Sequence, residues 1–197
     1  MRVRTATSLR ARLREGTAEL HRAVEARLAL GERDLTLDRY RDVLAALHGF
    51  YEPLEQRLAA VAAARPLGLT LRRRAPLLAD DLAWLGLSHD AIARLPRCTQ
   101  LPCVDDAGDA AGCLYVVEGA ALGGRVVTRA LQARLGTTAE RGGRFFADGG
   151  GDVPRRWATV VAWLDALGCD AHQAALAAAR ATFRTLDGWL RERDGAP

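Results

Sequence analysis

His21 and Glu25 are the first residues in this sequence of 197 residues whose types and spacing could support chemistry. Side chains four residues apart are neighbours on a helix, so the Glu25 carboxylate can hydrogen-bond one imidazole nitrogen of His21 and leave the other nitrogen free for a metal. Arg14 lies seven residues before His21, on nearly the same face and about 10 Å away along the helix axis. This spacing suits a flat ligand with a metal at its centre and anionic groups at its edge. A lone histidine on a helix is, however, more often an ordinary surface or core residue.

Three glycines form a second unusual feature. Gly119, Gly123 and Gly124 fall inside a stretch whose flanks have the hydrophobic spacing of a helix. Each interior glycine costs about 1 kcal/mol relative to alanine, and this chain otherwise uses alanine freely. Two explanations remain open: close packing or a kink between helices, and a ligand that lies directly against bare backbone.

The elements that must position these residues are predicted to be helices. Alanine and leucine dominate the composition, isoleucine occurs once, and aromatic residues make up only 6 % of the chain, which disfavours a β-sheet. The length suits one domain of ordinary size. We therefore predict a single all-α domain over residues 1–197, with loose termini at 1–7 and 194–197.

Hydrophobic periodicity, capping residues and prolines divide the chain into seven predicted helices. They cover about residues 8–30, 36–64, 76–86, 88–95, 110–135, 152–167 and 170–193. Pro53 is expected to kink or break the second of them. Residues 97–109 are expected to form a loop. Residues 136–151, which end in three consecutive glycines, are expected to form a flexible surface loop.

Composition and charge argue against several classes of protein. The net charge is only +4, and acidic residues are interleaved with the 28 arginines, so no nucleic-acid partner is expected. We expect no membrane association and a cytoplasmic location, because no apolar run approaches the roughly 20 residues of a membrane span and no secretory signal is recognisable. The four cysteines are expected to be reduced thiols, and their spacing matches no common zinc pattern.

Three segments, taken together, resemble the bacterial heme oxygenases, most closely the biliverdin-producing type that accompanies bacteriophytochromes. They are residues 13–21 (LREGTAELH), 51–55 (YEPLE) and 114–124 (LYVVEGAALGG), in this order and spacing. The resemblance extends from about Leu9 to Leu190. It implies a helical domain that holds heme between a proximal first helix and a kinked, glycine-rich distal helix.

The resemblance also implies roles for individual residues. His21 would be the proximal iron ligand, with Glu25 as its hydrogen-bonding partner. Gly119, Gly123 and Gly124 would allow the backbone to approach the heme and would admit iron-bound dioxygen.

Other implied site residues surround the heme. The side chains expected at a propionate or in the pocket wall are Arg14, Tyr115 and Phe183, with Arg156 and Arg180 as further candidates for a propionate contact. Ala120 is a departure from the family, because relatives carry an aspartate or a small hydroxyl residue there. Proton delivery would then depend on backbone groups and ordered water.

The implied activity is oxidative opening of heme, as both substrate and cofactor, to biliverdin, carbon monoxide and ferrous iron, by default at the α-meso carbon. Electrons would come from a ferredoxin or flavoprotein reductase, since the sequence has no Rossmann or flavin fingerprint. A bacteriophytochrome could receive the biliverdin. Two alternatives stay open: a non-catalytic heme carrier or sensor, suggested by Ala120, and a thiaminase-like hydrolase with Cys113 as its nucleophile.

Overall fold

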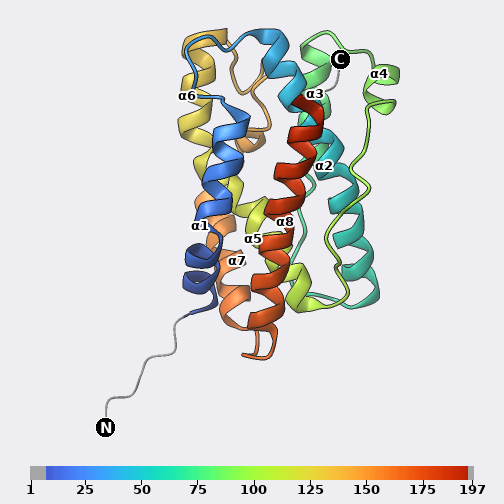
Figure 1. Cartoon of the computed structure of the whole chain (residues 1–197), viewed down its shortest axis with the longest axis vertical. Coiled ribbons are helices and arrows are strands. Elements are labelled where there is room, and N and C mark those ends of the chain that lie inside the picture. Colours follow the sequence, from blue (N-terminus) through green and yellow to red (C-terminus); the bar gives the residue numbers. More distant parts are fainter. Residues whose placement is uncertain (1–7, 195–197) are drawn as a thin grey trace.

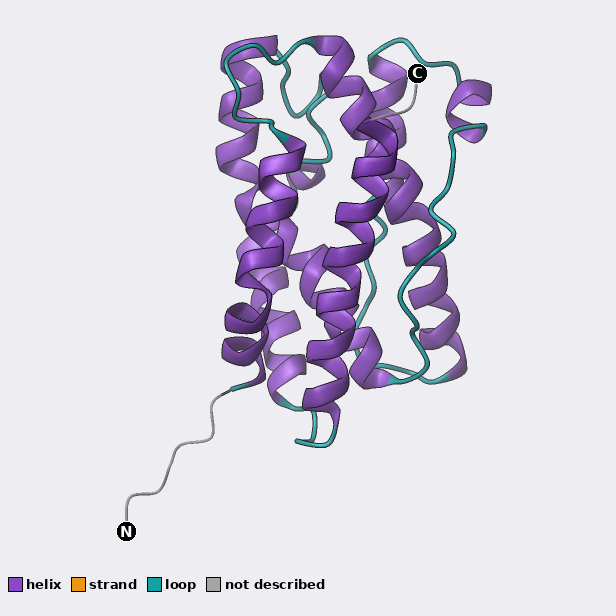
Figure 2. Cartoon of the chain, in the orientation of Figure 1, coloured by secondary structure: helices purple, strands orange, loops and turns teal. Residues whose placement is uncertain are grey.

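The computed structural model describes residues 8–194, and its regular elements are helices (Figures 1 and 2). In chain order these are α1 (Leu9–Leu28), α2 (Leu37–Ala64), α3 (Ala75–Trp84), α4 (His89–Ala93), α5 (Ala107–Gly119), the 3-10 helix η1 (Ala120–Gly123), α6 (Gly124–Leu135), the 3-10 helix η2 (Asp148–Gly150), α7 (Val153–Asp165) and α8 (Ala171–Asp194). The all-α prediction is confirmed. Of the expected loose termini, 1–7 and 195–197 lie outside the described residues, whereas Asp194 ends α8 and lies 2.7 Å from Arg39.

Side-chain caps start the first two helices at the predicted places. The Ser8 hydroxyl accepts a hydrogen bond from the Ala11 amide, and the Thr36 hydroxyl accepts one from the Arg39 amide. The predicted break at Pro53 does not occur, and α2 runs on to Ala64. Tyr51 before Pro53 and Leu54 after it are buried in the core, and this packing stabilises the helix despite the missing amide hydrogen.

The helix α5 packs directly against α8 in the middle of the bundle (Figure 1). A Cβ atom on Gly112 would lie 2.2 Å from the carbonyl oxygen of Ala175 and 2.6 Å from the amide nitrogen of Ala179. Only a glycine allows the two backbones to come so close. The helix α1 packs on α8 as well, so α8 fixes α1 and α5 relative to each other.

The segment Ala107–Leu135, which joins α5, η1 and α6, is long and apolar enough to cross a membrane when judged by length and composition. In the described structure, 56 % of its most apolar window is buried inside the protein. The helix α5 supplies most of this burial, because nine of its residues lie in the core. The apolar character of the segment is therefore accounted for by packing.

Two of the expected loops differ from the structure. The helix α5 begins at Ala107, where the Asp106 carboxylate accepts a hydrogen bond from the Asp109 amide, so it includes the last residues of the predicted loop 97–109. The segment 136–151 is not a surface loop, because Thr137, Phe145 and Asp148 are all buried. Composition misled the prediction here, since glycine permits tight packing as readily as it permits mobility.

The Gly112→Ala substitution should destabilise the protein by about 2 kcal/mol or more, because the new methyl group meets backbone atoms that cannot rotate away. Thermal unfolding would show this as a melting temperature lowered by several degrees. Gly188→Ala in α8 is the matched control, since a Cβ there meets nothing within 4 Å. That variant should be as stable as the wild type or slightly more stable. Equal losses in both variants would contradict the proposed role of Gly112.

Candidate functional site

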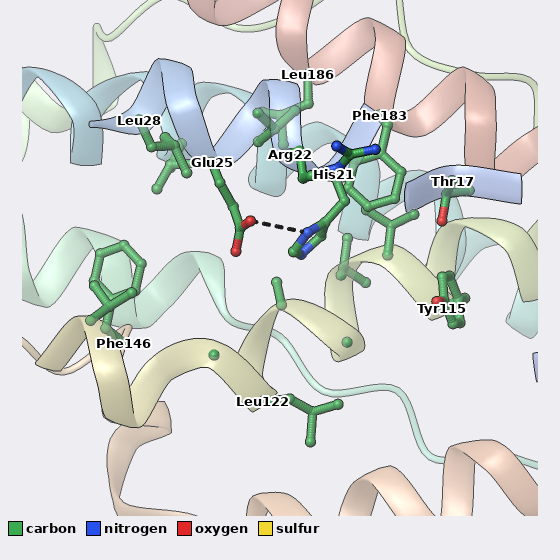
Figure 3. Close-up of a pocket in the computed structure, with 18 of the residues that line it drawn as sticks. Thr17, His21, Arg22, Glu25, Leu28, Tyr115, Leu122, Phe146, Phe183 and Leu186 are labelled. Carbon is green, nitrogen blue, oxygen red and sulfur yellow. Dashed lines mark ion pairs between the residues drawn. The ribbon is translucent and has the colours of Figure 1, made fainter. Parts of the chain in front are cut away.

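A cavity of about 700 Å³ lies between α1 and α8 on one side and the α5–η1–α6 segment on the other (Figure 3). Its volume falls within the roughly 300–1,000 Å³ of small-molecule sites. Most of its walls are apolar, and Phe145, Phe146 and Trp157 contribute to them from the segment after α6 and from α7. A large, mostly apolar ligand suits this space.

His21 projects from α1 into the cavity and points toward the α5–η1 segment (Figure 3). Its Nδ1 lies 3.3 Å from Oε2 of Glu25, one helical turn further along. The ring of Phe183 contacts the imidazole edge to face, with centroids 5.7 Å apart. With Nδ1 occupied and the ring held by Phe183, the Nε2 atom is the one available to a metal.

Gly119 and Gly123 line the cavity opposite α1. The helix α5 ends at Gly119, a 3-10 turn covers Ala120–Gly123, and α6 begins at Gly124, so the helix changes its path at the glycines. A Cβ on Gly123 would meet nothing within 4 Å, and one on Gly119 would make only ordinary contact, 3.6 Å from the Trp157 ring. Protein packing therefore does not explain these two glycines, whereas a ligand in the cavity would.

Gly124 differs from the other two glycines, because it is buried and does not line the cavity. A Cβ on Gly124 would lie 2.1 Å from the carbonyl oxygen of Phe146. Its bare backbone lets the segment that carries Phe145 and Phe146 lie against the start of α6. Both explanations left open by the sequence thus apply, each to different glycines.

The residues expected at the edge of a ligand fall into two groups. Arg14 and Tyr115 both line the cavity, and burial raises the pKa of the Tyr115 hydroxyl. Arg156 and Arg180 do not line it. The guanidinium of Arg156 is instead bound to two buried carboxylates, and that of Arg180 donates to the carbonyl oxygen of Gly16 at 2.9 Å.

Asp148 is the centre of a buried ion cluster behind the cavity wall. One of its carboxylate oxygens accepts hydrogen bonds from Arg72 at 2.7 Å and from Arg156 at 2.6 Å, and the other lies 3.5 Å from Nε of Arg74. Arg156 also donates to Glu118 at 2.8 Å, immediately before Gly119. These contacts tie the segment after α6 to α5 and α7.

Arg74 extends the ion cluster into the core, and its side chain is almost completely buried. It donates to the carbonyl oxygens of Val117 at 2.9 Å and Phe145 at 3.1 Å, and its guanidinium carbon lies 4.2 Å from the centre of the Phe145 ring. The Glu55 carboxylate accepts hydrogen bonds from the Arg74 and Ala75 amides. One guanidinium thus holds both the end of α5 and the aromatic wall, the part of the cavity wall formed by Phe145 and Phe146.

Asp81 fixes the same wall from α3. Its carboxylate accepts hydrogen bonds from the amides of Arg144 and Phe145, both at 2.8 Å. Burial is the main cause that raises the pKa of Asp81 to about 6, and the two backbone hydrogen bonds oppose that rise.

Sequence reasoning missed several residues of the cavity, namely Arg22, Tyr51, Phe145, Phe146 and Trp157. The Phe145-Phe146 pair was the one available signal, because two adjacent large aromatics are unusual in a glycine-rich loop. The others come from helices whose periodicity indicates burial but not which neighbour they face.

Cys113 does not line the cavity. It is buried against α8, where Thr182 donates a hydrogen bond to its sulfur at 3.3 Å. Burial raises the pKa of this thiol to about 11, so almost no thiolate forms near neutral pH. The structure gives no support to Cys113 as a nucleophile.

The pH dependence of stability should differ between the wild type and an Asp81→Asn variant. Because the folded-state pKa of Asp81 is raised to about 6, the folded chain binds its proton more tightly than the unfolded chain does. This contribution to stability is therefore lost as the pH rises from about 4 to 6. The stability of the wild type relative to Asp81→Asn should fall across this range, on the order of 3 kcal/mol.

Urea unfolding at a series of pH values measures that difference. Asp80→Asn, an exposed neighbour on the same helix, should leave the pH trend of the wild type in place. A difference between wild type and Asp81→Asn that is constant with pH would contradict the assignment.

Comparison with known proteins gives two kinds of match. A family model described as heme oxygenase matches residues 7–192. A heme oxygenase of Xanthomonas campestris pv. campestris is 36 % identical over 110 residues, which is 54 % of this chain and 61 % of that protein. The matched stretch thus spans about three fifths of the relative's length.

Two solved structures share the fold. The NO- and CO-bound heme oxygenase of Neisseria meningitidis superposes with a TM-score of 0.76 at 22 % identity, covering 98 % of this chain and 94 % of that one. The heme oxygenase of Leptospira interrogans gives a TM-score of 0.71 at 22 % identity, covering 94 % of this chain and 100 % of that one. The family model covers nearly the whole chain, and the fold and the cavity agree with it: this chain belongs to the heme oxygenase family.

Proposed function

We propose that this protein binds heme in the cavity and cleaves the macrocycle to biliverdin, carbon monoxide and ferrous iron. The observation that carries the proposal is the position of His21 across an apolar cavity from two glycines, Gly119 and Gly123, that no protein contact requires. When bound, heme would supply the redox chemistry with dioxygen. The chain would supply an iron ligand, a close-fitting cavity and anchors for the charged groups of the substrate.

His21 would ligate the iron through Nε2. The 3.3 Å contact between its Nδ1 and Glu25 supports this assignment, because such a partner fixes the tautomer and the orientation of the ring. Phe183 would keep the ring from rotating, since it lies against the imidazole edge to face.

Arg14 and Tyr115 would hold the propionates. Both line the cavity, and Arg14 has no ion-pair partner within residues 8–194, so its guanidinium can bind a carboxylate with two hydrogen bonds. Tyr115 supplies a hydroxyl donor, which stays protonated because burial raises its pKa. These two anchors would fix the heme in one rotational position and with it the meso carbon that is attacked.

The distal side offers no acidic or hydroxyl side chain at Ala120. Protons for bound dioxygen would therefore come through backbone groups of the η1 turn and ordered water. Gly119 and Gly123 would leave room for that water and for the oxygen molecule. This same feature favours one alternative, a non-catalytic heme carrier or sensor, which turnover measurements distinguish from an oxygenase.

The reaction needs electrons from a separate protein, for which a ferredoxin or a flavoprotein reductase is the proposed class. We also propose a cytoplasmic location, and a bacteriophytochrome as one recipient of the biliverdin.

The His21→Ala variant should lose the absorption signature of an imidazole-ligated heme and should form no biliverdin. Purified protein mixed with hemin, ascorbate and air provides both readouts, the Soret band and the biliverdin bands. Added imidazole should restore part of the Soret signature by entering the space left by the ring. His89→Ala, an exposed histidine on α4, is the control and should behave as wild type. Wild-type protein that binds hemin but leaves it intact under turnover would be a carrier or sensor instead.

Gly123 and Gly124 should respond in opposite ways to the same substitution. Gly123→Ala should keep the melting temperature within about 3 °C of wild type but lower the turnover rate severalfold, because its methyl group enters the cavity. Gly124→Ala should lower the melting temperature by more, because its methyl group would collide with the carbonyl oxygen of Phe146. Thermal unfolding with turnover assays separates the two roles, and a stability loss at Gly123 equal to that at Gly124 would refute the distinction.

A further inference from the structure

The outer face of α6 is basic and partly apolar. Its residues have no role in the heme binding and cleavage proposed above. The helix α6 carries Arg125, Arg129 and Arg134 but no acidic residue. It lies at the edge of the bundle (Figure 1), and only Gly124 and Leu131 of its residues are buried. Many other arginines of this chain are paired with carboxylates, such as Arg27 with Asp187 and Arg39 with Asp194.

Arg125 and Arg129 lie directly behind the cavity wall. Each is two residues from Val127, which lines the cavity, and two residues along a helix correspond to a rotation of about 200°. The two guanidinium groups are therefore on the opposite side of α6 from the cavity. Both side chains are exposed, and neither forms an ion pair within the described part of the chain.

Two exposed apolar side chains accompany these arginines. Val126 is 74 % exposed and Leu122 is 47 % exposed. Leu122, in the η1 turn, also lines the cavity (Figure 3), so it lies where the cavity wall meets this outer face of α6. Apolar contacts surrounded by charges of one sign are typical of surfaces that bind a partner briefly, because the charges steer the encounter and the apolar groups stabilise it.

We propose that this surface, formed by Leu122, Arg125, Val126 and Arg129, is the docking site for an acidic one-electron carrier protein. The inference rests on the proposed function. A partner that docks here is separated from the bound substrate by the thickness of one helix, about 10 Å. Each encounter passes one electron from the reduced carrier to ferric heme, after which the carrier leaves oxidised by one electron. Charge complementarity selects an acidic carrier over a basic or neutral one.

The test compares Arg125→Glu/Arg129→Glu with a control of equal charge change, Arg94→Glu/Arg184→Glu. Both control positions are exposed, Arg94 directly after α4 and Arg184 in α8. The first readout is direct binding of an oxidised, acidic [2Fe-2S] ferredoxin to each protein without heme, measured by calorimetry at low and high ionic strength. The α6 variant should bind at least tenfold more weakly than wild type and lose most of the salt dependence. The control variant should stay within about twofold of wild type.

The second readout is biliverdin formation with two electron sources. With the ferredoxin and its reductase, the α6 variant should show a KM for ferredoxin raised at least tenfold. With ascorbate, which needs no docking surface, its rate should equal that of wild type. Arg125→Ala/Arg129→Ala should lie between wild type and the charge-reversed variant, and its unchanged hemin spectrum would show that the fold is intact.

The outcomes separate the two proposals. Equal ferredoxin binding by wild type and the α6 variant, or an equal loss in the control variant, overturns the docking site. Failure of the wild type to bind any ferredoxin overturns it as well, while turnover with ascorbate would leave the heme oxygenase proposal standing. If ascorbate supports no turnover by the wild type, the heme oxygenase proposal is overturned. The ferredoxin-binding measurement then still tests the docking site independently.

Discussion

The buried carboxylate of Asp148 is the contact on which the shape of the cavity depends. It binds Arg72 and Arg74 from the segment before α3 and Arg156 from α7, and Arg156 also binds Glu118, next to Gly119. The three guanidinium groups pair with Asp148 and Glu118, while Glu55 accepts hydrogen bonds from the backbone amides of Arg74 and Ala75. This pairing matters because an unpaired charge at such a site costs several kcal/mol. The backbone at Asp148 is left-handed, with φ of 55°, and the two hydrogen bonds from Arg72 hold it there.

The ion cluster positions the side of the cavity that faces His21. Arg74 binds the carbonyl oxygens of Val117 and Phe145, so it connects the end of α5 to the aromatic wall. Gly124 allows that wall to lie against α6, since the carbonyl oxygen of Phe146 occupies the space of its missing side chain. Gly119 and Gly123 are then left facing open space. The ion cluster thus supports a surface without side chains at Gly119 and Gly123, opposite His21. The absence of a polar side chain at Ala120 makes that surface depend on backbone groups alone.

The proximal side is simpler, because one helix provides nearly all of it. His21, Glu25 and Arg14 share α1, and their mutual placement follows from helical geometry without help from the rest of the fold. The packing of α1 and α5 on α8 then sets the distance across the cavity, and Gly112 permits the close approach of α5 to α8. The segment α6 has two faces with different environments. One side of it closes the cavity and the other presents arginines to solvent.

The sequence by itself determined the helices and the local site motifs. Ser8 and Thr36 start helices where expected, the alanine-rich composition disfavours a sheet, and the His21–Glu25 pair follows from a spacing of four residues. These features depend on residues close together in the chain, where geometry is fixed by the helix. Only the tertiary structure decided that Pro53 is tolerated, that 136–151 is a packed wall, and that Arg156 belongs to Asp148 and not to a ligand. It also decided which glycines serve packing and which leave space. Those outcomes depend on contacts between residues far apart in the sequence, and no local pattern predicts which buried carboxylate will pair with which arginine.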